Sequence, residues 1–197
     1  KGLDSKGPVF LYAVPWPAQG LYSKKEINSV ADLKGLKFRA YNAATIRIAE
    51  LTGMAPTKIE AAEISQAFST GAVESMITSP TTGKNKKIWE NGVGYFYDIA
   101  AWFPKNMVIV NKDAWNKLDA DTQKLIMSEA AKAEKKGWDL SKRGNKEDKK
   151  ALADAGMKVG KVNTALKKHF ENVGATMSKE WADRAGTRGQ AVLAAYK

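Results

Sequence analysis

The most informative stretch of this chain is Asp32-Leu33-Lys34-Gly35-Leu36-Lys37-Phe38-Arg39-Ala40-Tyr41-Asn42. Ser29, just before it, and Asp32 form the S-x-x-D pattern that caps the beginning of a helix. Gly35 suits the left-handed residue that follows a helix. From residue 36 to residue 40, apolar and basic side chains alternate, which is the period of a half-buried strand. The stretch therefore predicts a short helix, a strand and the start of a second helix.

Arg39 stands at the carboxyl end of that predicted strand. In open α/β sheets, ligands bind at the carboxyl ends of the strands. A guanidinium at such a place grips a carboxylate with two parallel hydrogen bonds, each strengthened by charge. The alternative is an ordinary surface arginine, because arginine is common on protein surfaces. Spacing alone leaves both interpretations open.

Short predicted helices and strands alternate over the first half of the chain. Their boundaries come from prolines and glycines, which end periodic segments. Such alternation predicts an α/β fold built on a sheet. Strands are expected over 9–14, 36–40, 56–60, 73–78, 95–102 and 106–111, and helices over 43–52, 63–70 and 81–90.

The second half of the chain has a different character. No proline occurs between Asp119 and Ala155, where alanine, lysine and glutamate dominate, so one helix of about 50 Å is expected. A single small domain cannot cover such a length, so the helix is expected to bridge two lobes, with Gly137 and Gly144 as places for a bend. A strand over 157–162, a helix over 164–172 and a last helix after Ser178 complete the prediction.

Composition narrows the class of protein. The 197 residues include no cysteine, which excludes disulfides, thiol nucleophiles and cysteine metal sites. No apolar run approaches the roughly 20 residues needed to cross a bilayer. The net charge of +11 favours an anionic partner, which is a nucleic acid, a membrane surface or a small anion. Between Lys132 and Lys150 lysine alternates with acidic residues, which is typical of a solvated helix face rather than of a nucleic-acid-binding surface.

Three segments carry a resemblance to a known family. They are Tyr22 through Arg39, which contains the opening stretch; Glu63 through Gly71-Ala72-Val73-Glu74; and Leu118-Asp119-Ala120-Asp121-Thr122-Gln123. In this order they resemble the solute-binding subunit of tripartite ATP-independent periplasmic (TRAP) transporters, of the carboxylate-binding type. The resemblance runs from about Val9 to the end of the chain.

The resemblance implies a two-lobed α/β fold of the periplasmic-binding-protein kind, joined by hinge strands and the long helix. Residues 1–16 would be the remainder of the first lobe and a crossing strand, and 17–112 the second α/β lobe. Residues 113–197 would be the bridging helix and C-terminal helices that pack back on the first lobe. It also implies that this chain lacks the N-terminal third of such a protein. The implied function is a periplasmic receptor that closes over an organic acid and delivers it to membrane permease subunits.

The resemblance also implies a binding site. In the family, the arginine of the K-G-L-K-x-R strand holds the ligand carboxylate, and here it is Arg39. Many sugar-acid binders carry a second arginine upstream, where this chain has Gln19, so a ligand other than sialic acid is expected. Thr78 and Ser79 stand in place of an asparagine that often contacts ligand, and their hydroxyls can donate to a carboxylate.

Four aromatic residues, Trp16, Tyr41, Trp102 and Phe103, lie near these positions in the sequence. If they line the cleft, the ligand has an apolar or aromatic body. The other interpretation is hinge or core packing, since aromatic side chains dominate cores as well as pockets.

Two other functions stay open, an α/β enzyme acting on a small anionic substrate and a basic nucleic-acid-binding module. Glu60 and Glu63 have the spacing of paired carboxylates, but Glu63 falls in the first turn of a helix, where its charge favours the dipole. His169 is the only histidine, and one histidine makes neither a metal cluster nor a triad. The chain has no nucleotide-binding glycine loop. We therefore expect a receptor rather than an enzyme, without cofactor, metal or nucleic acid.

Overall fold

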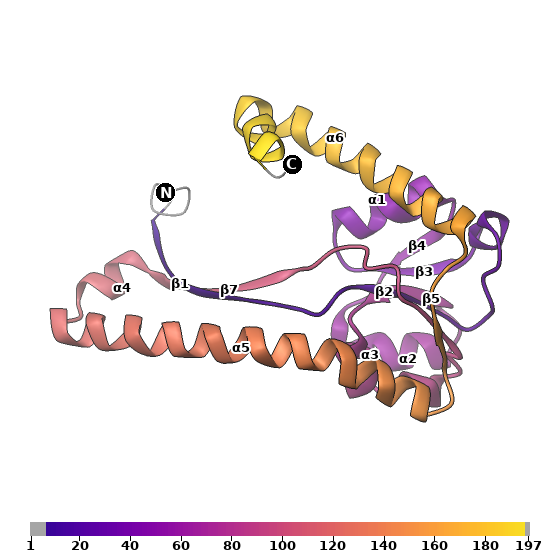
Figure 1. The fold of residues 1–197 in the computed structure, drawn as a ribbon, viewed down its shortest axis with the longest axis horizontal. Coiled ribbons are helices and arrows are strands. Elements are labelled where there is room, and N and C mark those ends of the chain that lie inside the picture. Colours follow the sequence, from indigo (N-terminus) through magenta and orange to yellow (C-terminus); the bar gives the residue numbers. More distant parts are fainter. Residues whose placement is uncertain (1–6, 196–197) are drawn as a thin grey trace.

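The computed structural model describes residues 7–195, and a six-stranded sheet lies at one end of the molecule (Figure 1). Helix α1 (Ala43–Thr52) and the start of α6 (Thr164–Ala195) lie on one face, and α2 (Ile64–Ser69) and α3 (Pro80–Asn85) lie on the other. The predicted α/β class is confirmed. In sheet order, the strands are β4 (Ala55–Lys58), β3 (Lys37–Ala40), β5 (Ser75–Thr78), β2 (Gly20–Ser23), β6 (Tyr95–Tyr97) and β8 (Lys158–Gly160).

All strands of this sheet except β2 point the same way. Strand β3 is parallel to β4 and β5, β6 is parallel to β8, and β2 is antiparallel to both β5 and β6. The carboxyl ends of five strands and the amino end of β2 therefore meet at one edge of the sheet, which we call the carboxyl edge. Ligands bind at this edge in open α/β sheets.

Each face of the sheet carries its own apolar core, because successive strand residues point to opposite faces. The two cores differ in the helices that cover them. The first core contains Leu21, Phe38, Ile77 and Tyr97 with Ile48 of α1 and Leu166 of α6, and the second contains Tyr22, Met76 and Phe96 with Phe68 of α2 and Leu152.

A long arm extends from the sheet (Figure 1). It is formed by β1 (Pro8–Pro15) paired antiparallel with β7 (Lys105–Asn111), by α4 (Lys112–Asn116) and by α5 (Ala120–Asp154). Helix α5 runs through its two glycines as one element of 35 residues, which confirms the long helix that the sequence predicts. Within residues 7–195, no helix is both long and apolar enough to cross a membrane.

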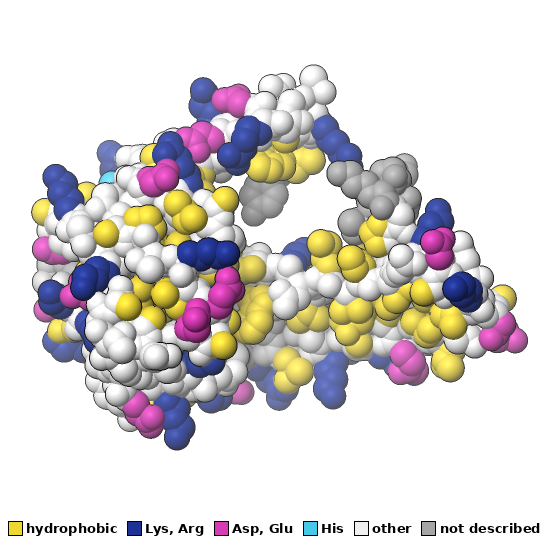
Figure 2. All heavy atoms as spheres, turned by 180° about the vertical axis from the view of Figure 1, so that it is seen from behind, with side chains coloured by type: hydrophobic (Ala, Val, Ile, Leu, Met, Phe, Trp, Pro, Cys, Tyr) yellow, Lys and Arg dark blue, Asp and Glu magenta, His cyan; other side chains and the backbone are white. Residues whose placement is uncertain are grey.

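Two hydrogen bonds connect helix α5 to the backbone of Ala13 in β1. The Ala13 N–H donates to Glu134 Oε1 at 3.0 Å, and the Trp138 indole N–H donates to the Ala13 carbonyl at 3.1 Å. The helix thereby satisfies backbone groups on the edge of β1 that faces away from β7. Figure 2 shows hydrophobic side chains gathered along the arm, and exposed apolar residues there include Phe10, Met107, Val108, Ile109 and Leu125.

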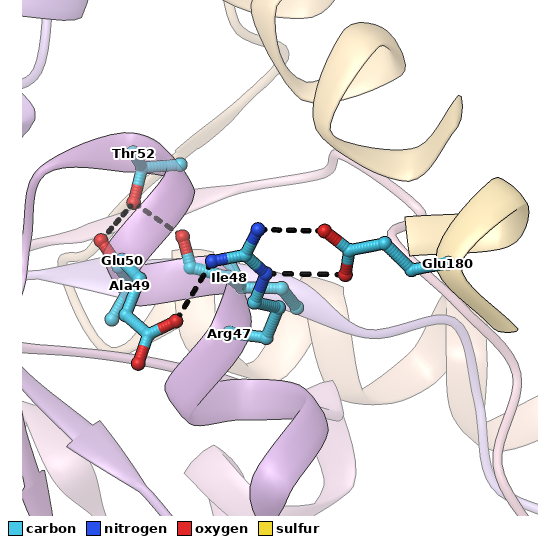
Figure 3. A network of polar contacts seen from close by, with 6 residues as sticks. All are labelled: Arg47, Ile48, Ala49, Glu50, Thr52 and Glu180. Carbon is cyan, nitrogen blue, oxygen red and sulfur yellow. Dashed lines mark hydrogen bonds and ion pairs between the residues drawn. The ribbon is translucent and has the colours of Figure 1, made fainter. Parts of the chain in front are cut away.

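Helix α6 is anchored to α1 by an ion pair (Figure 3). Arg47 donates from Nε and Nη2 to the two carboxylate oxygens of Glu180, at 3.1 and 2.6 Å. Leu166 and Val173 of α6 also belong to the first apolar core. These contacts of α6 are with the predicted second lobe, whereas the expected packing of the C-terminal helices is on the first. The division into 1–16, 17–112 and 113–197 stays a prediction, and its residues 1–6 and 196–197 lie outside the described part.

The opening stretch folds as its local signals indicate. A 3₁₀ helix spans Val30–Leu33, and the Asp32 carboxylate accepts from the N–H groups of Asn28 and Ser29 at 2.9 and 2.8 Å. Gly35 follows with φ of 71°, in the left-handed region. Strand β3 comes next, and then α1.

The sheet differs from the prediction at two places. No strand is predicted over Gly20–Ser23, because this segment is short and becomes strand β2 only by pairing with β5 and β6 on both sides. The strand expected over 95–102 ends at Tyr97, since the Ile99 N–H bonds back to the Tyr97 carbonyl and Ala100 has a φ of 45°.

Two predictions for helices are also wrong. The helix expected over 81–90 is α3 followed by a 3₁₀ helix, Ile88–Asn91, because Lys87 adopts a left-handed conformation with φ of 44°. The helices expected over 164–172 and after Ser178 are continuous, and the interruption comes at Gly186, with φ of 61° and ψ of −150°.

Candidate functional site

The sheet brings six of the eight predicted site residues to the carboxyl edge. The parallel order of β3 and β5 places the ends of these two strands side by side, and the reversed β2 begins at the same edge. Residues far apart in the sequence therefore meet there. They are Arg39 and Tyr41 at the end of β3, Thr78 and Ser79 at the end of β5, Gln19 before β2, and Trp102, whose backbone bonds to Gln19.

Arg39 is almost completely buried, with 5% of its surface exposed. It alternates with Phe38 and Ala40, which belong to the first core, so it points to the opposite face of the sheet. Its Nε–H donates to the Ile59 carbonyl at 3.0 Å. Among the described residues, neither terminal nitrogen of the guanidinium has a hydrogen-bond partner. Arg39 is therefore not the ordinary surface arginine of the alternative interpretation.

Burial lowers the pKa of the Arg39 guanidinium, and the nearby Tyr41 and Glu60 act in the opposite direction. Because arginine starts from a very high pKa, the group keeps its positive charge. A buried cation with uncommitted donors is a strong site for an anion, since the surroundings screen the charge less than water does.

Tyr41 lies against Arg39, with its ring centroid 4.7 Å from the guanidinium carbon. Burial raises the pKa of the Tyr41 hydroxyl, while Arg39 and a hydrogen-bonding contact from Trp102 lower it. Trp102 itself is half-buried and packs against the first core. The structure therefore brings Arg39, Tyr41 and Trp102 together.

Thr78 and Ser79 differ in what their hydroxyls do. Ser79 is fully buried and caps α3, since its Oγ accepts from the Thr82 N–H at 3.1 Å and lies 3.0 Å from Thr82 Oγ1. Thr78 is 7% exposed, and its hydroxyl has no hydrogen-bond partner among the described residues. Thr78 is therefore the better-placed hydroxyl for a ligand, and the role of both residues stays a prediction.

Gln19 and Trp16 lie in a segment that crosses the edge beside residues 101–104. The Gln19 N–H donates to the Trp102 carbonyl at 3.1 Å, and the Trp16 N–H donates to the Pro104 carbonyl at 2.8 Å. The Gln19 side chain is buried and donates to the Pro17 carbonyl, within its own segment. Trp16 and Phe103 are 37% and 63% exposed, so neither serves as core packing in the described part of the chain.

A cavity of about 860 Å³ lies on the α1 and α6 side of the sheet. Its wall is mainly apolar and includes Ile48, Ile77, Trp102, Phe170 and Met177. Ile48 and Ile77 belong to the first core, on the face opposite to the Arg39 side chain. Asn42 and Trp102 also line the cavity, so its wall reaches the carboxyl edge next to Tyr41, whose ring contacts the Arg39 guanidinium.

Sequence reasoning missed the groups that hold this edge in place. The Ile59 carbonyl, which binds Arg39, is a backbone group and leaves no signal in the side-chain pattern. Two ion pairs tie the edge to α5: Asp148 with Lys84 of α3 at 2.7 Å, and Lys149 with Asp98, just after β6, at 2.5 Å. These partners are 64 and 51 residues apart in sequence, so only the fold pairs them.

The carboxylates proposed for the enzyme alternative have a structural explanation. Glu63 Oε2 accepts from the Glu60 N–H at 3.1 Å, which is the reciprocal bond of a capping box at the turn before α2.

A comparison with protein-family models decides the family. The model described as "Bacterial extracellular solute-binding protein, family 7" matches residues 18–184. The chain belongs to this family. The resemblance to the carboxylate-binding solute receptors of TRAP transporters is thereby confirmed, and the proteins of this family and the relatives named below are solute-binding proteins rather than enzymes.

Curated relatives of this family-7 chain are longer than the chain itself. The sialic acid-binding periplasmic protein of Vibrio cholerae is 33% identical over 111 residues, which are 55% of this chain and 33% of that protein. A solute-binding protein of Albidiferax ferrireducens is 25% identical over 174 residues, which are 87% of this chain and 51% of that protein. The chain thus spans between a third and about half of the length of these relatives.

Solved structures of TRAP receptors match almost the whole chain. A Bordetella pertussis extracytoplasmic solute receptor that binds pyroglutamic acid is 42% identical, with a TM-score of 0.95, over 99% of this chain and 64% of the receptor. A TRAP solute-binding protein from a marine metagenome, specific for pyroglutamate, is 38% identical, with a TM-score of 0.94 and the same coverage. The predicted two-lobed receptor fold is confirmed by these matches.

Proposed function

We propose that this chain is part of an extracytoplasmic receptor that binds a small organic acid between two lobes. The observation that carries the proposal is the Arg39 guanidinium, buried at the carboxyl edge with Nε held by the Ile59 carbonyl. Arg39 binds the carboxylate, and Thr78 adds a hydroxyl donor. Closure of the lobes excludes water and strengthens this ion pair.

The first ligand to test is pyroglutamate. The two solved receptors of highest identity named above bind it, at 42% and 38% identity. Gln19 stands where sugar-acid binders carry a second arginine, which disfavours sialic acid although a curated relative is named for it. Trp16, Tyr41, Trp102 and Phe103 line the cleft beside the apolar part of the ligand.

The receptor is proposed to act in the periplasm and to hand its ligand to the permease subunits of a TRAP transporter. The arm offers the surface for the rest of the first lobe, because apolar side chains are exposed along it and the solved receptors extend beyond this chain. Contiguous exposed apolar surface of this kind marks an interaction site.

Native mass spectrometry followed by calorimetry tests the proposal on the full-length protein. We expect denaturation to release a small organic acid that is chemically unchanged. We also expect pyroglutamate to bind, while its amide, which lacks the carboxylate, does not. A panel in which no organic acid binds would overturn the receptor function, and chemical conversion of the bound acid would favour the enzyme instead.

A second panel tests the apolar body of the ligand. Thermal shift measurements compare pyroglutamate, benzoate and phenylacetate with succinate and acetate. Stabilisation by the ring-bearing acids supports a cleft lined by the four aromatic residues. If only the small aliphatic acids stabilise the protein, the aromatic lining is wrong while the carboxylate site stands.

A further inference from the structure

The orientation of the Arg39 guanidinium is fixed by two different contacts. Its Nε–H donates to the Ile59 carbonyl at 3.0 Å, which sets the direction of one edge of the planar group. The Tyr41 ring lies 4.7 Å from Cζ, within the range of a cation–π contact. The hydrogen bond fixes the direction in which Nε points. The Tyr41 ring restrains the guanidinium plane from rotating about the axis of that hydrogen bond.

These contacts restrict how the guanidinium can bind a carboxylate. Arginine binds a carboxylate with two parallel bonds, either from Nε and one terminal nitrogen or from both terminal nitrogens. Nε carries a single hydrogen, which the Ile59 carbonyl already accepts. A carboxylate can therefore bind through two hydrogen bonds without breaking the bond to Ile59 only if Nη1 and Nη2 donate together. This arrangement requires the guanidinium plane to be aligned with the carboxylate.

Tyr41 is itself held firmly enough to impose that plane. Its N–H donates to Thr45 Oγ1 at 2.9 Å, at the capped start of α1, where Asn42 Oδ1 accepts from the Thr45 N–H. The Tyr41 ring in turn lies against the Arg39 guanidinium. Tyr41 thus joins the start of α1 to Arg39.

We propose that Tyr41 is a positioning residue, whose ring orients Arg39 so that Nη1 and Nη2 together bind the ligand carboxylate. The proposal rests on the proposed function, in which Arg39 is the carboxylate-binding group. It assigns Tyr41 an action through Arg39 in addition to a place in the cleft wall. Removing the ring then weakens binding even of acids that are too small to touch it.

Calorimetry with pyroglutamate and acetate on the full-length protein tests this role. We expect Tyr41→Phe, which keeps the ring, to bind within about twofold of the unmodified protein, and Tyr41→Leu to bind roughly five- to tenfold more weakly. In an Arg39→Lys background, where the planar group is absent, Tyr41→Leu should change affinity by less than about twofold. Such non-additivity is not produced by a merely structural role.

Tyr95 provides a matched control. The Lys158 ammonium group lies 5.2 Å from the centroid of the Tyr95 ring. Tyr95 is on β6 and Lys158 is on β8, away from the candidate site residues. Tyr95→Leu therefore removes a similar cation–π contact at another place. We expect this variant to bind as the unmodified protein does. If Tyr41→Leu also binds normally while Arg39→Ala does not bind, Tyr41 does not position Arg39.

A measurement without ligand separates this inference from the proposed function. With ¹⁵N-labelled arginine, we expect a slowly exchanging Nε–H signal from Arg39 in the unmodified protein and in Tyr41→Phe, and faster exchange in Tyr41→Leu. Equal exchange in all three proteins overturns the positioning role. If no acid binds but the exchange rates differ as expected, the proposed function fails and the positioning of Arg39 stands.

Discussion

Arg39 combines features that rarely occur together in one side chain. It is nearly fully buried, it carries a full charge, and one hydrogen bond to Ile59 is the only one it makes within residues 7–195. Buried charges are normally paired, because removal from water is costly. A buried guanidinium with free donors favours the binding of an anion, as the proposed carboxylate receptor requires.

Replacing Arg39 by lysine tests that capacity. Lysine keeps the charge but lacks the planar pair of donors, so we expect Arg39→Lys to lose at least tenfold in affinity, on the order of 1.4 kcal/mol. Calorimetry with the bound acid gives the value. Arg47→Lys is the matched control, since Arg47 pairs with Glu180 on the surface between α1 and α6 and should leave affinity unchanged. Unchanged affinity in Arg39→Lys would remove Arg39 from the site.

Among the helices and strands, the close contact between α5 and β1 depends on a glycine, Gly137, which has no side chain. A Cβ at Gly137 would lie 2.4 and 2.8 Å from the two methyl groups of Val14, closer than side chains normally approach. Glycine costs helix stability at that position, but it lets α5 approach β1 closely enough for Glu134 and Trp138 to hold Ala13. Gly137 thus lowers the intrinsic stability of the helix at this position but permits the close packing of α5 against β1.

Two alanine substitutions separate these effects. Gly137→Ala should destabilise the protein by about 1–3 kcal/mol, because overpacking against Val14 outweighs the gain in helix propensity. Gly174→Ala in α6 meets no atom within 4 Å and should stabilise by up to about 1 kcal/mol. Urea unfolding of both variants measures the difference. Stabilisation by Gly137→Ala would show that α5 and β1 separate without cost.

At the scale of the whole molecule, α5 connects the arm to the carboxyl edge. Asp148 accepts from Thr81 Oγ1 at 2.6 Å and pairs with Lys84, both in the helix that follows Thr78 and Ser79. The adjacent Lys149 pairs with Asp98, where the chain leaves the sheet for the crossing segment. Two successive residues of the long helix therefore hold both sides of the candidate site.

Asp148 is the residue on which this connection depends, since it is 5% exposed. Asp148→Ala leaves its buried surroundings without an acceptor, and we expect a loss of about 1–3 kcal/mol in the free energy of unfolding. Asp154→Ala, on the same helix, removes a surface ion pair with Lys150 and should change the free energy of unfolding by less than about 0.5 kcal/mol. Equal losses in the two variants would show that the buried pair does not fasten α5 to the sheet.

Local signals predicted much of the fold because they act over a few residues. The cap at Asp32, the left-handed Gly35, strand β3 and the uninterrupted α5 all follow from neighbours in the sequence. Predictions were wrong where a distant contact or a local turn decides the structure. Strand β2 exists because β5 and β6 pair with it, and β6 stops because the chain turns at Ala100.

The candidate site divides in the same way. The α/β class, the long helix, and Arg39 at the end of a strand follow from the sequence alone, because periodicity, caps and turn residues are local properties. The burial of Arg39 against Ile59 and Tyr41, and the arrival of Gln19 and Thr78 at the same edge, follow from the folded sheet. The physical reason is strand order and direction: hydrogen-bonded pairing across the sheet, rather than proximity in the chain, determines which side chains meet.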